Sequence, residues 1–148
     1  MSGWPDYRSQ ILLVAAAVIL TAAGCAPHAA TAHEPAPTAK ELKDLELAYA
    51  SWRRAVTCAT TAAPRPVPGA EQEVARGDAV IARAKVHGLG DIIQQIDAEY
   101  RRVDATADWS CGDGDQMAPP GFEVGRLNNL RGAVDWLSKA IESAIAGG

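Results

Sequence analysis

The chain has 148 residues, a formal net charge of −4 and 48% hydrophobic residues, but few aromatic side chains (four Trp, three Tyr and one Phe). This length fits one domain at most, since domains commonly hold roughly 100–150 residues. Because 18 carboxylates outnumber 14 Lys and Arg, the charge argues against nucleic acid as a partner, and the composition excludes a collagen, a wholly disordered chain and a disulfide-dense miniprotein.

An export signal is predicted at the N-terminus. The first ten residues carry a single cation, Arg8, and the apolar run 11–23 follows. This run is too short to span a bilayer core, which takes about 20 residues. A short apolar run that follows a basic residue and ends in small residues is typical of a signal peptide. We therefore expect residues 1–24 to be a signal peptide that is removed.

The end of this run, Ala22-Ala23-Gly24-Cys25, resembles the lipobox of bacterial lipoproteins. In that family a cysteine after small residues is acylated and becomes the new N-terminus. The resemblance implies that Cys25 is the lipidation site and that its acyl chains, palmitate among them, anchor the protein to a membrane of the cell envelope; two or three chains suffice. Because Ala26 rather than an Asp follows Cys25, the resemblance favours an anchor in the outer membrane, facing the periplasm, if the source has two membranes. The alternative is an ordinary signal peptide cut after the triplet 30–32, which would release a soluble protein without Cys25.

The lipidated cysteine and a flexible tether occupy residues 25–37. The segment is rich in Pro and Ala and has no large apolar side chain with which to build a core. At about 3.1 Å per residue it would reach roughly 35–40 Å. His28 and His33 lie in it without a third ligand, so we interpret them as solvated linker residues rather than a metal site.

Residues 38–148 are predicted to form an all-α domain, a small up-down bundle of about four helices. Thr38 and Glu41 have the spacing of a capping box, which starts a first helix that runs to about residue 60, before the prolines at 64, 66 and 68. Apolar residues recur at three- and four-residue steps along each expected helix, and no stretch shows the alternation of a strand. Four antiparallel helices with short loops would pack these stripes.

The remaining helices are bounded by glycines and prolines. A second helix is expected over 70–87, with a thin stripe of small side chains. Gly88 is expected to take a positive φ at its end, and Asp91 to cap a third helix that stops before Trp109. A last helix is expected over 122–146.

The three cysteines suggest one disulfide. An odd number in an exported protein requires an explanation for the remaining thiol. If Cys25 carries lipid, Cys58 and Cys111 remain, and an oxidising compartment would join them. In an up-down bundle, the helix ends that carry these two residues lie at the same pole. The bond would stabilise the domain by roughly 4 kcal/mol in the loop-entropy model.

No catalytic site, metal or cofactor is predicted. His87 is the only histidine of the folded part and falls in the last turn of a helix, where an imidazolium favours the negative end of the dipole. The acidic residues near Asp113 and Asp115 lack EF-hand spacing and are ordinary turn residues, and no phosphate-binding loop or haem motif occurs. We therefore expect a protein that is not an enzyme.

Three residues are candidates for contact with a partner. Arg53 and Arg54 could meet an anionic partner, although such pairs are more often a solvated helix face. Trp136 lies off the main stripe of its helix, on a narrower one with Ala133 and Ala140. We expect it to fill a groove beside the second helix; the alternative is an exposed anchor, since Trp is enriched at binding hot spots.

The favoured function is that of a non-enzymatic envelope lipoprotein, an adaptor or accessory that acts through protein–protein contacts. One alternative follows from the segment Trp52-Arg53-Arg54-Ala55-Val56-Thr57-Cys58, which resembles the Trp, Arg and Cys signature of helical lysozyme-inhibitor lipoproteins. That resemblance implies an inhibitor of a cell-wall hydrolase. Another alternative is an envelope protein that binds a small ligand or a metal in the bundle, which only His87 and scattered Asp residues support.

Overall fold

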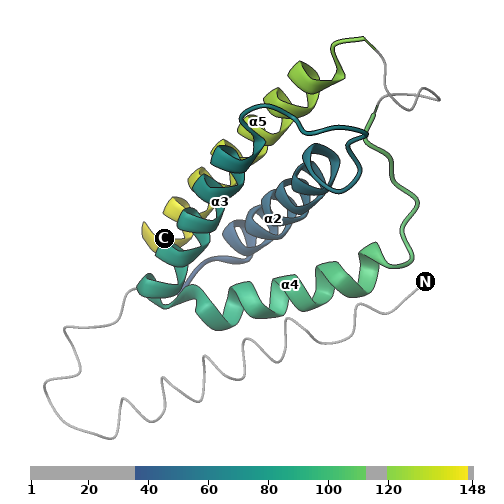
Figure 1. Cartoon of the computed structure of the whole chain (residues 1–148). Helices are drawn as coiled ribbons and strands as arrows, with labels where there is room; N and C mark the ends of the chain where they lie inside the picture. The colour runs from purple at the N-terminus through teal and green to yellow at the C-terminus, as the bar shows by residue number, and fades with distance from the viewer. Residues whose placement is uncertain (1–35, 113–119, 147–148) are drawn as a thin grey trace, which may run out of the picture. The chain divides into compact units, whose positions relative to one another are not determined.

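The computed structural model describes residues 36–112 and 120–146 (Figure 1). Within these ranges the chain forms four α-helices and no strand, which confirms the all-α class predicted from the sequence. The helices are α2 (Ala39–Ala59), α3 (Ala70–Ala84), α4 (Gly90–Asp104) and α5 (Phe122–Ala146). A kinked segment, Lys85–Leu89, joins α3 to α4, and His87 and Gly88 within it have non-helical backbone angles. The expected signal peptide, Cys25 and nearly all of the tether lie outside the described residues.

The first helix begins at the predicted capping box. The Thr38 hydroxyl accepts from the Glu41 backbone N–H at 3.2 Å, and the Glu41 carboxylate accepts from the Thr38 N–H at 2.7 Å. Two backbone donors that lack partners inside the helix are thereby satisfied. The helix ends at Ala59, before the proline-containing loop.

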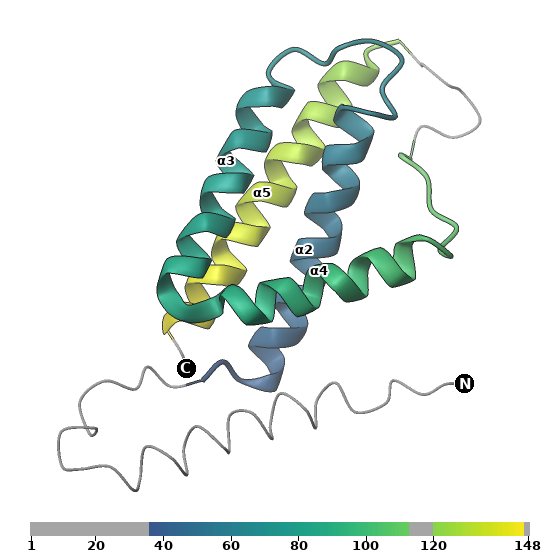
Figure 2. The ribbon, with the colours of Figure 1, turned by 60° about the horizontal axis from the view of Figure 1, so that its bottom comes forward.

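Three of the helices run side by side, as Figure 2 shows for α2, α3 and α5. Helices α3 and α5 run in the same direction, because three side-chain contacts join residues at a nearly constant sequence separation of 58 or 59: Arg131 with Glu73, Arg76 with Asp135, and Arg83 with Glu142. Helix α2 is antiparallel to both α3 and α5. The largest fully buried side chains lie where these helices meet: Leu45 of α2 and Leu130, Val134, Leu137 and Ile141 of α5.

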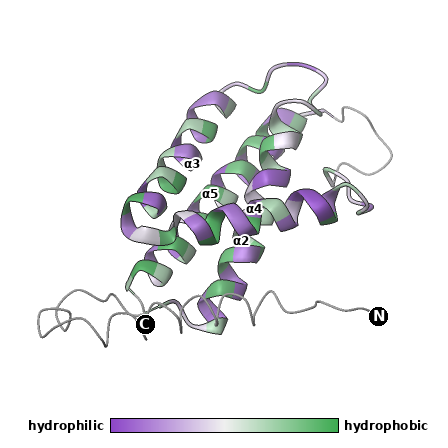
Figure 3. Cartoon of the chain, turned by 90° about the horizontal axis from the view of Figure 1, so that it is seen from below, coloured by the Kyte–Doolittle hydropathy of each residue, from purple (hydrophilic) through white to green (hydrophobic). Residues whose placement is uncertain are grey.

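Helix α4 does not lie alongside the other three. It crosses α2 (Figure 2), so the described helices do not form the simple up-down array expected from the sequence. Hydrophobic and hydrophilic positions alternate along α3 and α4 (Figure 3), and the buried positions of α4 are Ile93 and Ile96. Tyr49 of α2 donates a hydrogen bond to Asp97 at 2.5 Å, which adds a polar contact where the two helices cross.

The corner between α3 and α4 needs a glycine. Gly88 has φ 86°, as predicted, a conformation that a side chain would strain. The expected cap at Asp91 is wrong: Leu89 occupies the N-cap position, no side chain caps the helix, and Asp91 lies in the first turn. There its carboxylate favours the positive end of the helix dipole. Helix α4 ends at Asp104, slightly earlier than expected.

None of the described helices combines the length and the hydropathy that a bilayer span requires.

Candidate functional site

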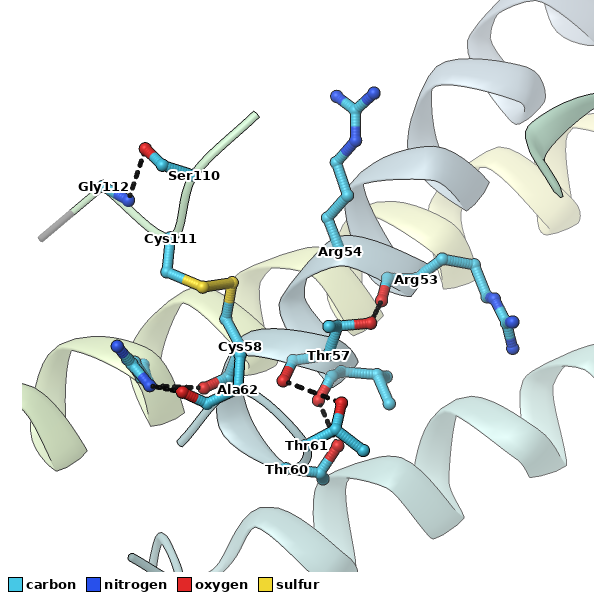
Figure 4. The surroundings of a disulfide bond; sticks show 12 residues. Arg53, Arg54, Thr57, Cys58, Thr60, Thr61, Ala62, Ser110, Cys111 and Gly112 are labelled. Carbon is cyan, nitrogen blue, oxygen red and sulfur yellow. Dashed lines mark hydrogen bonds between the residues drawn. A yellow bond between two sulfur atoms is a disulfide. The ribbon is translucent and has the colours of Figure 1, made fainter. Parts of the chain in front are cut away.

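The disulfide predicted from the cysteine count is present in the structure. Cys58, near the end of α2, is bonded to Cys111, in the segment that follows α4 (Figure 4), with Cα atoms 5.6 Å apart and a sequence separation of 53. The bond attaches the segment after α4 to the end of α2. It therefore fixes the far end of α4, whose near end is fixed by the corner at Gly88.

A buried arginine of α5 lies beside this disulfide. The Arg126 guanidinium donates to the backbone carbonyls of Cys58 and Ala62 at 3.0 and 3.1 Å, and the side chain is only 5% exposed. Its cationic centre also lies 4.9 Å from the ring centroid of Phe122. A cation at the carbonyl end of a helix satisfies acceptors that have no partner inside the helix and favours the negative end of the dipole. Arg126 thus joins α5 to the end of α2.

Sequence reasoning missed Arg126, although a signal for it was available. Arg126, Leu130, Ala133 and Leu137 follow one another at steps of four, three and four residues. An arginine that occupies a position in the apolar stripe is expected to be buried. A buried arginine in turn requires hydrogen-bond acceptors.

A groove of about 420 Å³ opens between α2 and α5 next to the disulfide. Two of the described residues that line it are charged, Arg54 and Arg126, and none of them is Asp or Glu. Volumes of this size lie in the range of ordinary small-ligand sites, about 300–1,000 Å³. Its lining includes Arg54 and Cys58 of α2, Cys111, and Arg126, Asn128, Asn129 and Trp136 of α5.

Trp136 stands at one end of this groove and not where it was expected. Its side chain is 38% exposed, and the indole N–H donates to the Asp44 carboxylate of α2 at 3.2 Å. The prediction that Trp136 fills a groove beside the helix at 70–87 is therefore wrong. The space above Gly77 in α3 is occupied instead by Trp52, which is 5% exposed. The physical reason is that Trp136 lies on the side of α5 that faces α2.

The neighbouring arginines Arg53 and Arg54 project from α2 in different directions (Figure 4). The Arg53 guanidinium lies 5.7 Å from the ring centroid of Tyr100 in α4. Arg54 lines the groove; its Nε is 3.8 Å from Asp104, and its guanidinium lies 5.7 Å from the ring centroid of Trp109. The two arginines, which the sequence treats as a pair, therefore belong to different surroundings, and Arg54 is the one that joins Trp136 at the groove.

The polar contact between Tyr49 and Asp97 lies on the other side of α2. Burial raises the pKa of the Tyr49 phenol above its usual value, and the hydrogen bond to the Asp97 carboxylate raises it further. Arg101 pairs with the same carboxylate at 2.8 Å. A phenol held protonated in this way serves as a hydrogen-bond donor that holds α4 against α2.

The other candidate residues are not brought together. His87 is exposed at the corner between α3 and α4, away from the groove. Trp52, the tryptophan of the lysozyme-inhibitor-like segment, is a core residue. No group of three or more His, Cys, Asp or Glu suited to a metal occurs in residues 36–112 and 120–146, and Asp113 and Asp115 lie outside them.

In comparisons with known proteins, no protein-family model, no curated protein and no solved structure matches the chain. The candidate site is therefore defined by its own geometry: a groove between two helices, with an exposed tryptophan at one end and a disulfide at the other.

Proposed function

We propose that this protein is a lipid-anchored cell-envelope protein that performs no enzymatic chemistry and acts as an adaptor or accessory by binding another protein. The anchor rests on the lipobox-like residues that end in Cys25. The binding surface is the groove between α2 and α5. The observation that carries the proposal is the exposed Trp136 at the end of that groove.

The setting of Trp136 supports a role in binding. A tryptophan offers a large contact area with few rotatable bonds, and such residues dominate the energy of many protein interfaces. The hydrogen bond to Asp44 holds the indole in one orientation, so less side-chain entropy is lost when a partner binds. The exposed Leu47 precedes Ser51 of the groove by one helical turn, on the same face of α2. An apolar contact surface can therefore continue beyond the groove along α2.

Site-specific photo-crosslinking in the intact envelope tests this proposal. A photoreactive phenylalanine derivative replaces Asn129 in the groove in one variant of the full chain. In the control variant it replaces Val86, an apolar residue that is 84% exposed at the corner between α3 and α4. We expect a discrete crosslinked protein from position 129 and none from position 86, and a weaker crosslink when Trp136→Ala is added. Equal crosslinking from both positions, or none from position 129, would contradict the proposal.

The anchor is tested separately. Cys25→Ser is expected to abolish acylation, which mass spectrometry of the N-terminal peptide measures, and to release the protein from the membrane fraction. An unmodified N-terminus at another residue in wild-type protein would contradict the lipoprotein assignment. The two tests are independent, because loss of the anchor leaves the groove intact.

Inhibition of a cell-wall hydrolase is a narrower form of the same proposal, since an inhibitor also acts through protein contact. Purified full-chain protein would then slow lysozyme, and Trp136→Ala would relieve the inhibition. The proposal of a bound small ligand or metal is tested by native mass spectrometry of protein taken from the envelope.

A further inference from the structure

We infer that the Cys58–Cys111 disulfide is a redox-sensitive latch. When a dithiol reduces the bond, residues 97–112 (the latched segment) leave the surface of α2, while α2, α3, α5 and the first half of α4 stay folded. The latched segment consists of the second half of α4 and the chain that leads to and just past Cys111. The switch requires no partner protein, so it goes beyond the proposed function and does not rest on it.

The two halves of α4 differ in burial. In the first half, Ile93 and Ile96 are each 3% exposed and belong to the core, as does Leu89 directly before the helix. In the latched segment no residue is buried, and Tyr100 packs against the core only as a partly buried ring. Burial of apolar surface therefore holds the first half of α4 in place and contributes little to the latched segment.

Two polar contacts join the latched segment to α2. Tyr49 donates a hydrogen bond to Asp97, and its ring meets that of Tyr100 edge to face, with centroids 6.2 Å apart. Arg54 Nε and Asp104 Oδ1 are 3.8 Å apart, and both atoms are buried without a hydrogen-bond partner among the described residues. An ion pair that leaves water without forming a hydrogen bond regains little of its desolvation cost. Of the two polar contacts, only that of Tyr49 is well formed.

The other contacts of the latched segment are also weak. The guanidinium of Arg53 lies over the ring of Tyr100 and that of Arg54 over the ring of Trp109, each 5.7 Å from the centroid. Cation–π contacts at partly exposed sites contribute little individually. Two further ion pairs join residues of α4 to each other and so do not attach it to α2: Arg101 with Asp97, and Arg102 with Glu99.

The disulfide is therefore the decisive attachment of the latched segment. A helical stretch as short as residues 97–104 is marginal in water unless it is packed against something. Once the bond to Cys58 is broken, the next helix along the chain begins only at Phe122. Residues 97–104 would then fray, and the chain as far as Gly112 would move with them. The core residues at the start of α4 would keep that end of the helix in place.

The chemistry of release is thiol–disulfide exchange with a dithiol. Cys58 is 8% exposed, whereas Cys111 is only partly buried, so the attacking thiolate meets Cys111 Sγ first. A mixed disulfide forms there, and Cys58 leaves as a thiolate. The second thiol of the dithiol then displaces Cys111. Two electrons and two protons have passed to the two cysteines, which end as thiols, and the dithiol ends as a disulfide.

The two redox forms would present different surfaces. Release of the latched segment uncovers the ring of Tyr49, which is 5% exposed in the disulfide-bonded form. It also removes Ser110 and Cys111 from the lining of the groove between α2 and α5. Reduction would thus change both sides of α2 at once.

Limited digestion with trypsin tests the latch on the full chain, isolated from the envelope in detergent micelles. One sample keeps its disulfide. The other is treated with dithiothreitol without denaturant, alkylated, and freed of the dithiol before trypsin is added. We expect full reduction under these conditions and cleavage after Arg101 or Arg102 that is about tenfold faster than in the disulfide-bonded sample, because proteolysis follows the population of the open form.

Two exposed arginines outside the latched segment are internal controls: Arg83 of α3 and Arg131 of α5. Cleavage after them should stay much slower than after Arg101 in both samples, because it requires unfolding of the helices that remain packed. Fragments are identified by mass spectrometry after full reduction, since the disulfide would otherwise hold a cleaved chain together.

Variants separate the latch from other effects. Cys58→Ala/Cys111→Ala should be cleaved like the reduced sample, which excludes an effect of alkylation. Tyr49→Phe removes the hydrogen bond to Asp97 and should speed cleavage after Arg101 several-fold in the reduced form, with little change in the disulfide-bonded form. Asp135→Asn is the matched control, because Asp135 pairs with an arginine of α3 away from α4. It should leave cleavage after Arg101 unchanged in both forms.

Three outcomes would overturn the inference. A disulfide that dithiothreitol reduces only in denaturant would not be a switch of the folded protein. Equal cleavage after Arg101 in the two samples would show that the bond does not hold the latched segment. Cleavage after Arg83 and Arg131 as fast as after Arg101 in the reduced sample would show that the whole domain unfolds. Crosslinking from position 129 tests the proposed function separately, and its failure would leave the latch unaffected.

Discussion

The indole of Trp52 lies directly against Gly77, so that an ideal Cβ on Gly77 would come within 2.3 Å of Trp52 Nε1. Helix α3 carries a glycine at this point because the large ring of α2 fills the space that a side chain would need. The thin stripe of small residues seen in the sequence of α3 thus reflects a close approach to a tryptophan.

Gly77→Ala is expected to destabilise the domain by about 1–3 kcal/mol, because overpacking outweighs the gain in helix propensity. Gly125→Ala is the matched control, since a Cβ there would meet nothing within 4 Å. It should be neutral or stabilise by up to about 1 kcal/mol. Urea unfolding measures both. Equal free energies of unfolding for the two variants would contradict the packing of Trp52 on Gly77.

Trp136→Ala should lower the free energy of unfolding by about 1–2 kcal/mol, between the values for surface and core positions, because the ring is 38% exposed and makes one hydrogen bond. Trp52→Ala should cost about 3–5 kcal/mol. The comparison is made by chemical denaturation. A larger loss for Trp136→Ala than for Trp52→Ala would show that their roles are reversed.

Arg126→Met should destabilise the domain by about 2–5 kcal/mol, because it removes two charge-assisted hydrogen bonds to carbonyls at the end of α2. Arg131→Met is the control: Arg131 is an exposed α5 arginine, 3.4 Å from Glu73, and such pairs contribute at most about 1 kcal/mol. Thermal unfolding of both variants measures the difference. Similar melting temperatures would mean that Arg126 does not stabilise the end of α2.

The Tyr49 phenol should titrate later than a free tyrosine. Its pKa is raised above the usual 10.0 by burial and by the Asp97 carboxylate, and burial also raises the pKa of Tyr100. Because the folded state holds the proton more tightly, the stability gained from Tyr49 is fully present below pH 10 and is lost as the pH rises above it. Tyrosinate absorbance of native and urea-unfolded protein measures this. Tyr49→Phe should remove one of the two late-titrating tyrosines, leaving that of Tyr100, and should reduce the fall in stability above pH 10. A native titration identical to the unfolded one would contradict this prediction.

Reduction of Cys58–Cys111 should lower the stability by roughly 4 kcal/mol in the loop-entropy model. Protein isolated from the envelope without reductant should contain no free thiol at these two positions, as alkylation and peptide mass mapping would show. The double variant Cys58→Ala/Cys111→Ala should match the reduced protein in its unfolding midpoint. Two alkylated cysteines in untreated protein would rule out the bond in the envelope.

The helices of this protein could be predicted from its sequence because their signals are local. Thr38 and Glu41 cap α2 through groups three residues apart, and the limits expected for the last helix agree with α5 (Phe122–Ala146). Gly88 took the positive φ that its place between two helices indicated. The pairing of Cys58 with Cys111 followed from counting, and Cys25 as the lipidation site stays a prediction.

The relationships between helices could not be predicted in the same way. The spacing along α5 placed Trp136 off the main apolar stripe but did not predict which helix Trp136 faces. The small residues of α3 indicated a large neighbouring side chain but did not identify it as Trp52. The crossing of α4 depends on contacts between distant residues, such as Tyr49 and Asp97, which periodicity does not encode. The groove was missed for the same reason, since its lining comes from α2, α5 and the segment at Cys111.

The corner at Lys85–Leu89 also limits how the length of the chain can vary. Only His87 and Gly88 at this corner have non-helical backbone angles, so the turn between α3 and α4 is short and one inserted residue there would displace the start of α4. Asp97 would then be displaced from Tyr49, and Ile93 from the core. In the loop at 60–69 between α2 and α3, residues 64–66 are exposed. An insertion there would leave the Ala62 carbonyl bound by Arg126 and the buried Val67 in place, at a modest entropic cost. Insertions and deletions should therefore be tolerated in the loop between α2 and α3, and should destabilise the domain at the corner between α3 and α4.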